Sequence, residues 1–268
     1  IWQNHFPDHQ GISNRMCLIV FNWSPEQTHW LTLAANRDEF WHRPTAELHS
    51  WNNDSGIVAG QDLEQGGTWL GGNHYGQFAA LTNVRAPGVG PANPQSRGLI
   101  VRDYLVLRTT AEQYGKDLLQ RCEAFAPFNL LLADRHQLLF LSNYPQPVMQ
   151  PVTPGMHVLS NASLDTPWPK ALLAKQQLSQ WQPATEDVSA LADLLSDPSV
   201  FADEQLPETG VPYEWEKMLS AQLIVSDAYG TRCSTAIIAT DAGMTLCEHT
   251  RNQKGRITDT RQQDLTFR

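Results

Sequence analysis

The stretch LTLAANRDEF, residues 31–40, begins as an alternating apolar run and passes abruptly into four polar residues, Asn36-Arg37-Asp38-Glu39. The alternation predicts a β-strand that ends at this polar tetrad. A second strand is expected at residues 17–21, CLIVF, and Ser24-Pro25 between the two favours a turn. The two stretches therefore predict an antiparallel hairpin with polar side chains at its open end.

The hairpin returns the tetrad to Cys17. A symmetric register pairs residues whose numbers sum to about 53, which sets Cys17 opposite Asn36 and brings Arg37 and Asp38 close to it. A guanidinium beside a thiol lowers the pKa of the thiol because it stabilises the thiolate. A carboxylate such as Asp38 can anchor a protonated amine or hold Arg37 by paired hydrogen bonds. These residues alone are equally consistent with a reactive cysteine and with a buried structural cysteine beside a surface ion pair.

Met16-Cys17 resembles a translation start. Removal of Met16 would give Cys17 a free α-amine, whose reference pKa near 8 suits a general base for its own thiol. Residues 1–15 lack the basic start and apolar core of a signal peptide and are interpreted as a leader, an extension or a cloning remnant. Residues 16–268 are expected to form a single domain.

The rest of the chain alternates blocks of strands with pairs of helices, which favours an α+β fold. Further strands are expected at residues 56–59, 68–70, 77–83, 129–133, 137–142, 157–161, 222–227, 234–240 and 244–248. Helices are expected at residues 99–108, 111–122, 169–181 and 188–195. Residues 86–97 and 206–215 are expected to be irregular loops.

Composition excludes several classes of function. A formal charge of −9 and a pI near 5.4 argue against non-specific binding to nucleic acid or anionic membranes. No apolar run reaches the roughly 18–20 residues of a membrane span. The four cysteines form no CxxC pair, and Pro7 separates His5 from His9, so no metal site is expected and reduced thiols in a cytoplasmic protein are the default.

Three more polar positions follow or precede predicted strands. Asn83 and Asn161 each end an apolar run, and Arg232 lies in a glycine-containing turn before a strand. An asparagine amide can donate a hydrogen bond to a developing oxyanion. Asparagine is more often a simple turn former, and a turn arginine is usually solvated.

Taken together, these segments resemble the NRDE family, the relatives of the transport and Golgi organisation protein. The resemblance covers residues 16–268 and is carried by Met16-Cys17, Asn36-Arg37-Asp38-Glu39, Gly66-Gly67-Thr68-Trp69-Leu70-Gly71, Ala80-Leu81-Thr82-Asn83, Leu159-Ser160-Asn161 and Tyr229-Gly230-Thr231-Arg232. It implies a four-layer αββα sandwich of two antiparallel sheets, an N-terminal-nucleophile hydrolase-like fold. The chain departs from the family at Cys233, where relatives often have serine, and in the 15 residues before Met16.

The resemblance also implies roles for particular residues. Cys17 would be the nucleophile, Arg37 the thiolate partner and Asp38 the amine anchor, with Asn83 and Asn161 as polar donors and Arg232 as a second arginine. The implied reaction is hydrolysis of the amide bond of a small molecule, with no cofactor required. The alternative is a non-catalytic carrier of haem or a lipid-like ligand, since the family is linked to haem trafficking and has no settled reaction. The oligomeric state is left open.

Overall fold

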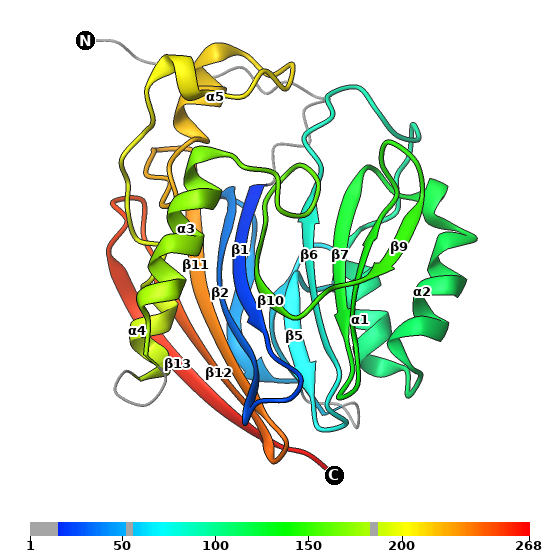
Figure 1. Ribbon diagram of the computed structural model, residues 1–268. Helices are drawn as coiled ribbons and strands as arrows, with labels where there is room; N and C mark the ends of the chain where they lie inside the picture. Colours follow the sequence, from blue (N-terminus) through cyan, green and yellow to red (C-terminus); the bar gives the residue numbers. More distant parts are fainter. Residues whose placement is uncertain (1–15, 52–55, 183–186) are drawn as a thin grey trace.

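Two antiparallel sheets pack face to face in the computed structural model, which describes residues 16–51, 56–182 and 187–268 (Figure 1). The first sheet has the strand order β10-β1-β2-β11-β12-β13. Its strands are β1 (Met16–Trp23), β2 (His29–Phe40), β10 (Gly155–Leu159), β11 (Tyr229–Thr240), β12 (Gly243–Arg251) and β13 (Ile257–Thr266). The second sheet has the order β3-β4-β5-β6-β7-β8-β9. Its strands are β3 (Thr45–Ser50), β4 (Ile57–Asp62), β5 (Leu70–Asn73), β6 (Phe78–Asn83), β7 (Phe128–Ala133), β8 (Leu138–Ser142) and β9 (Val148–Pro151).

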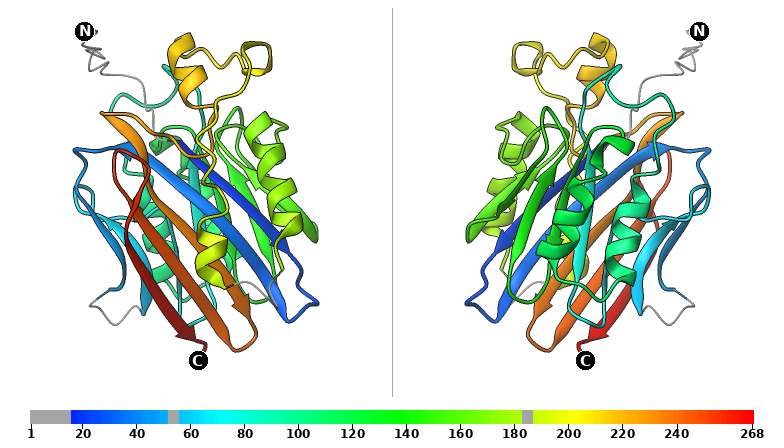
Figure 2. Two further views of the ribbon diagram at one scale, coloured as in Figure 1. Left: turned by 90° about the vertical axis from the view of Figure 1, so that its left-hand side faces the viewer. Right: turned by 90° about the vertical axis from the view of Figure 1, so that its right-hand side faces the viewer.

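Alternation along β1 explains why both faces of the first sheet are covered. Ile19 and Phe21 point into the core between the sheets, whereas Leu18 and Val20 pack on the opposite face against helices. Those helices are α3 (Pro169–Gln180) and α4 (Val188–Ala192), while α1 (Gly98–Val106) and α2 (Ala111–Leu119) cover the outer face of the second sheet. Figure 2 shows the resulting layers from two sides. The predicted αββα sandwich is confirmed.

The structure corrects the predicted end of the second strand. The tetrad lies inside β2, which continues to Phe40 because β1 and β11 pair with its backbone on both sides. The predicted register was wrong by one residue, since Cys17 pairs with Arg37 and Leu18 with Asn36. The polar side chains of this stretch are tolerated because they are paired: Asn36 Oδ1 accepts a hydrogen bond from Ser234, Asp38 Oδ1 accepts one from Thr231, and Arg37 pairs with Glu39.

Other predicted elements also differ. Residues 222–227 form no strand, and β3, β9 and β13 were missed. These three strands have mostly intermediate or exposed positions, so they lack the apolar runs that mark the central strands. The helix predicted to run to residue 122 ends at Leu119 and is followed by the 3-10 turn η1 (Cys122–Ala124).

The loop predicted at residues 206–215 contains the start of a short helix, α5 (Tyr213–Met218), which follows the 3-10 turn η2 (Asp203–Gln205). Figure 1 shows α5 at the end of the molecule where β1 begins. Its chain neighbour Leu219 packs with Met16 and Tyr229 in a small apolar cluster. This segment therefore covers the region of Cys17. The interpretation of residues 1–15 lies outside the described residues and stays a prediction.

Candidate active site

Cys17 is the second residue of β1 and lies on the inner face of the first sheet. It is 9% exposed and borders a small pocket. Arg37, its cross-strand partner, borders the same pocket, together with Trp69 and Leu81 from the second sheet. The pocket thus opens between the two sheets and presents a thiol, a guanidinium and apolar walls.

Arg37 is buried against the second sheet. Its guanidinium lies 4.2 Å from the ring centroid of Trp69 and forms an ion pair of 3.5 Å with Glu39. Its Nη1 donates a long hydrogen bond of 3.4 Å to Thr45 Oγ1. These contacts orient the guanidinium beside Cys17 and explain why a charged residue is stable inside the sandwich.

The electrostatics of Cys17 differ from the sequence-based expectation. Burial raises the pKa of its thiol to about 12, Asp38 adds to the rise, and Arg37 offsets only part of it. The expectation that Arg37 lowers the pKa holds for its own contribution and is wrong for the net shift. The reason is that desolvation of a thiolate outweighs one nearby cation. With Met16 attached, Cys17 is a protonated thiol at neutral pH.

Asp38 lies on the opposite face of β2 from Arg37. Its Oδ1 accepts a hydrogen bond of 2.6 Å from Thr231 Oγ1, and burial raises the pKa of its carboxyl to about 6. Lys170, fully buried in the first turn of α3, offsets part of that rise by its positive charge. Asp38 therefore borders the start of β1 from the helix side of the sheet, next to Met16.

Lys170 was missed by the sequence reasoning. Its Nζ donates a hydrogen bond of 2.8 Å to the Leu219 carbonyl, and burial lowers the pKa of its ammonium to about 8. Its titratable neighbours are Arg85, Asp38, Cys17 and Glu216. A lysine at the start of a helix is usually solvated, so no local signal distinguishes this one.

The two asparagines meet at the junction of the two sheets. Asn161 Nδ2 donates to the Asn83 carbonyl at 2.9 Å, so this amide braces the neighbouring chain in the structure. Ser160 Oγ lies 3.1 Å from the Cys17 carbonyl and 3.1 Å from Asn161 Oδ1. Ser160 therefore connects Cys17 to the asparagine pair. From the segment Leu159-Ser160-Asn161, the sequence-based prediction placed Asn161 in the site and did not include Ser160.

Arg232 lies within β11 and not in a turn, which corrects the prediction. A β-bulge between Thr231 and Cys233 leaves Arg232 without a cross-strand partner on β2. Its Nη1 donates to the carbonyls of Phe40 at 2.9 Å, Trp41 at 3.3 Å and Arg43 at 3.0 Å. These hydrogen bonds hold residues 40–43, which follow the tetrad.

Asn36, the first residue of the tetrad, is structural: its Nδ2 donates to the carbonyls of Leu195 and Gln222.

The described residues include no group of three or more His, Cys, Asp or Glu side chains arranged to hold a metal ion. Cys17, Cys122, Cys233 and Cys247 are all free and buried. Within the same described ranges, no helix combines the length and the apolar character that a bilayer crossing requires.

The αββα layers place Cys17 near the start of β1, with Arg37 opposite it on β2. The model of the family Transport and Golgi organisation 2 matches residues 16–253, and the chain belongs to this family.

The relatives of this chain span nearly its full length. It is 32% identical over 262 residues to the human Transport and Golgi organization protein 2 homolog, covering 89% of this chain and 94% of the relative. The Drosophila melanogaster Transport and Golgi organization protein 2 is 29% identical over 250 residues, covering 83% and 87%. A Caenorhabditis elegans ortholog of N-acylethanolamine-hydrolyzing acid amidase aligns with a TM-score of 0.47 and 13% identity, covering 83% of this chain and 92% of that one. That last likeness is too distant to indicate an activity.

Proposed function

We propose that this protein is an N-terminal-nucleophile-type hydrolase in which Cys17 cleaves the amide bond of a small molecule. The observation that carries the proposal is the position of Cys17, which lies on the wall of a pocket directly opposite the buried Arg37. The thiol at the pocket wall supplies the nucleophile of such a reaction, and a neighbouring guanidinium stabilises its thiolate.

The reaction needs a chain that begins at Cys17. The freed α-amine takes the thiol proton, and sulfur attacks the amide carbonyl to form a tetrahedral intermediate. The amine product leaves with a proton, and water hydrolyses the resulting thioester to a carboxylic acid and the regenerated thiol. Asp38 next to Met16 is suited to anchor that α-amine, and Arg37 to stabilise the thiolate.

Supporting roles fall to three further residues. Asn83 and Asn161 lie where Ser160 joins the chain to Cys17, which favours a role in binding the oxyanion or in holding the strand. Arg232 serves the site by fixing the segment after the tetrad. We assign it a positioning role.

Proteolytic maturation and activity are tested together. Intact mass reports whether the mature chain begins at Cys17, and a screen of small amides then compares that chain with one that retains Met16. The proposal expects turnover only in the chain that begins at Cys17, and its loss in Cys17→Ser because a serine hydroxyl is far less ionised. Turnover that survives Cys17→Ser would refute it.

A second candidate is a carrier of haem or a lipid-like ligand, and one observation favours it. The pKa of Cys17 is raised to about 12 in a pocket walled by Trp69, Leu70 and Leu81, which suits apolar binding better than nucleophilic attack. The names of the relatives also refer to transport. Haem affinity that Cys17→Ser leaves unchanged, with no turnover by a chain that begins at Cys17, would favour the carrier. A cytoplasmic location stays a prediction in either case.

A further inference from the structure

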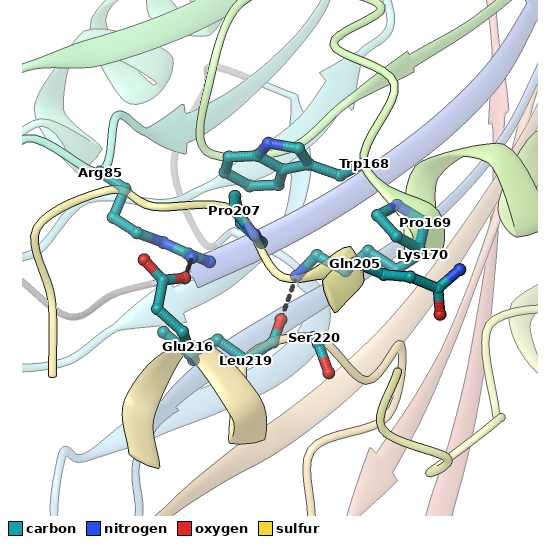
Figure 3. A pocket seen from close by; sticks show the side chains of 9 residues that line it. All are labelled: Arg85, Trp168, Pro169, Lys170, Gln205, Pro207, Glu216, Leu219 and Ser220. Atoms are coloured by element: carbon teal, nitrogen blue, oxygen red, sulfur yellow. Dashed lines mark hydrogen bonds and ion pairs between the residues drawn. The ribbon is translucent and has the colours of Figure 1, made fainter. Parts of the chain in front are cut away.

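A second, small pocket has Lys170 in its lining (Figure 3). Four segments contribute to it: Arg85 after β6, the start of α3, the chain around Pro207, and the chain from α5 to Ser220. Its lining residues are Arg85, Trp168, Pro169, Lys170, Gln205, Pro207, Glu216, Leu219 and Ser220. The walls are mainly apolar, and the charged groups are concentrated at Arg85, Lys170 and Glu216.

The guanidinium of Arg85 is only partly satisfied. Its side chain is 2% exposed, its Nη1 forms an ion pair with Glu216, and its central carbon lies 4.8 Å from the Trp168 centroid. Figure 3 shows the guanidinium between Trp168 and Glu216. Its Nε and Nη2 atoms are buried and have no hydrogen-bond partner among the described residues. An unmade hydrogen bond of a buried charged donor is costly, so this edge calls for an acceptor.

The free edge is the one that binds carboxylates side-on. Arg43 of the same chain directs its Nε and Nη2 at a single carboxylate oxygen, at 3.0 and 2.7 Å from Asp62 Oδ2. In Arg85 the Nε and Nη2 donors are left over because Glu216 Oε2 contacts only Nη1. The other carboxylate oxygen of Glu216, Oε1, accepts a hydrogen bond from the Thr209 N–H. Two parallel N–H donors of an arginine match the two oxygens of a carboxylate.

The charged groups around the pocket already balance one another, because Glu216 pairs with Arg85 and Asp38 stabilises the charge of Lys170. The unpartnered N–H donors of Arg85, and not an excess of charge, are therefore what favours an acceptor here. The walls formed by Trp168, Pro207 and Leu219 suit the apolar body that carries the carboxylate.

The second pocket is linked to Cys17 through two residues. The Arg85 backbone N–H donates to the Asn161 carbonyl at 2.7 Å, and Asn161 contacts Ser160, which reaches the Cys17 carbonyl. Lys170 borders the pocket and has Cys17 among its titratable neighbours. We propose that Arg85 binds the carboxylate of an acidic amphiphile at this second pocket. This inference does not depend on hydrolysis at Cys17.

The test measures binding in Cys17→Ser protein, where turnover cannot occur. N-octanoylglycine, its neutral analogue N-octanoylglycinamide and octyl phosphate are titrated by calorimetry. The acid is expected to bind roughly 10- to 100-fold more tightly than the amide, the range of a charge-assisted hydrogen-bond pair. Equal affinities would overturn the proposal, and tighter binding of octyl phosphate would overturn the carboxylate assignment.

A double substitution locates the effect. Arg85→Met with Glu216→Gln removes the Arg85–Glu216 ion pair without leaving an unpaired charge. This double variant is expected to bind N-octanoylglycine no more tightly than N-octanoylglycinamide, while its affinity for the amide stays as in the parent protein. The matched control is Arg251→Met with Asp193→Asn, which removes a buried arginine pair near α4 and should retain the preference. A preference that survives the Arg85 change in folded protein would overturn the proposal. Turnover of neutral amides without any acid preference would refute this subsite alone, whereas acid preference without turnover would refute only the hydrolase.

Discussion

Asp38 and Lys170 each stabilise the charged form of the other across the buried face of the first sheet. Asp38 comes from the middle of β2 and Lys170 from the first turn of α3, so their attraction joins the sheet to its covering helix. The attraction does not cancel the cost of burial, which raises the pKa of Asp38 to about 6 and lowers the pKa of Lys170 to about 8. The pair is therefore a measurable source of pH-dependent stability next to Cys17.

We expect Asp38→Asn to remove a fall in stability between about pH 4 and pH 6. The folded state holds the Asp38 proton more tightly than the unfolded state, in which the carboxyl has its ordinary pKa of 3.8, so the wild-type protein loses stability as pH rises through this range. The contribution is up to about 3 kcal/mol in the free energy of unfolding. Urea unfolding at pH 4.5 and 6.5, followed by tryptophan fluorescence, measures it. The other carboxyls are the same in both proteins, so their contribution cancels. If the difference in the free energy of unfolding between Asp38→Asn and wild type were the same at pH 4.5 and pH 6.5, this assignment would be wrong.

The alkylation rate of Cys17 should depend on whether Met16 is present. With Met16 attached, a thiol pKa of about 12 leaves little thiolate at pH 7.5. A freed α-ammonium next to the thiol lowers that pKa, so the chain that begins at Cys17 should react with iodoacetamide at least about tenfold faster. Mass mapping identifies the modified residue.

Cys17→Ser supplies the background of Cys122, Cys233 and Cys247 in that experiment, since all three are buried. Of the four thiols, Cys17 of the processed chain is expected to react first. Equal rates in both chains, or modification of Cys122 first, would argue against a nucleophilic Cys17.

Ser160→Ala should loosen the start of β1. The substitution removes the hydroxyl that lies 3.1 Å from the Cys17 carbonyl, at an expected cost of about 1 kcal/mol in the free energy of unfolding. Local opening should then raise the alkylation rate of Cys17. Ser142→Ala is the matched control, because Ser142 is similarly buried and donates to backbone carbonyls at the far end of β8. Similar costs in stability are expected, with faster alkylation only in Ser160→Ala; the same rate in both would show that Ser160 does not hold Cys17.

Arg232→Met separates a positioning role from a catalytic one. Methionine keeps an apolar contact with Trp41 but loses the donors to three carbonyls, so we expect a loss of about 1–2 kcal/mol in the free energy of unfolding. Below the melting temperature, turnover or ligand affinity should stay within about threefold, since chain positioning has some redundancy in a paired strand. Complete loss of function at unchanged stability would instead support direct catalysis by Arg232.

The alternation of apolar residues was sufficient to predict the central strands. Residues 17–21 and 31–35 are buried on both faces of the first sheet, and such runs are distinctive in sequence. The edge strands β3, β9 and β13 could not be recognised in this way, because much of their surface is exposed and polar residues are tolerated there. Residues 222–227 include the apolar residues Leu223 and Ile224, and both are buried. The segment nevertheless does not pair as a strand.

The meeting of Cys17 with Arg37 and Asp38 at the open end of the first hairpin follows from sequence alone, because covalent connection and a short turn bring these residues together. The charge states and the further members of the site depend instead on how the layers pack. The pKa of Cys17 reflects how much solvent the second sheet excludes, which no local pattern encodes. Lys170 and Ser160 reach the site from other parts of the chain, through the packing of α3 and the junction of the two sheets. Their burial is a property of the assembled layers, so it follows from long-range packing and not from the residues beside them in sequence.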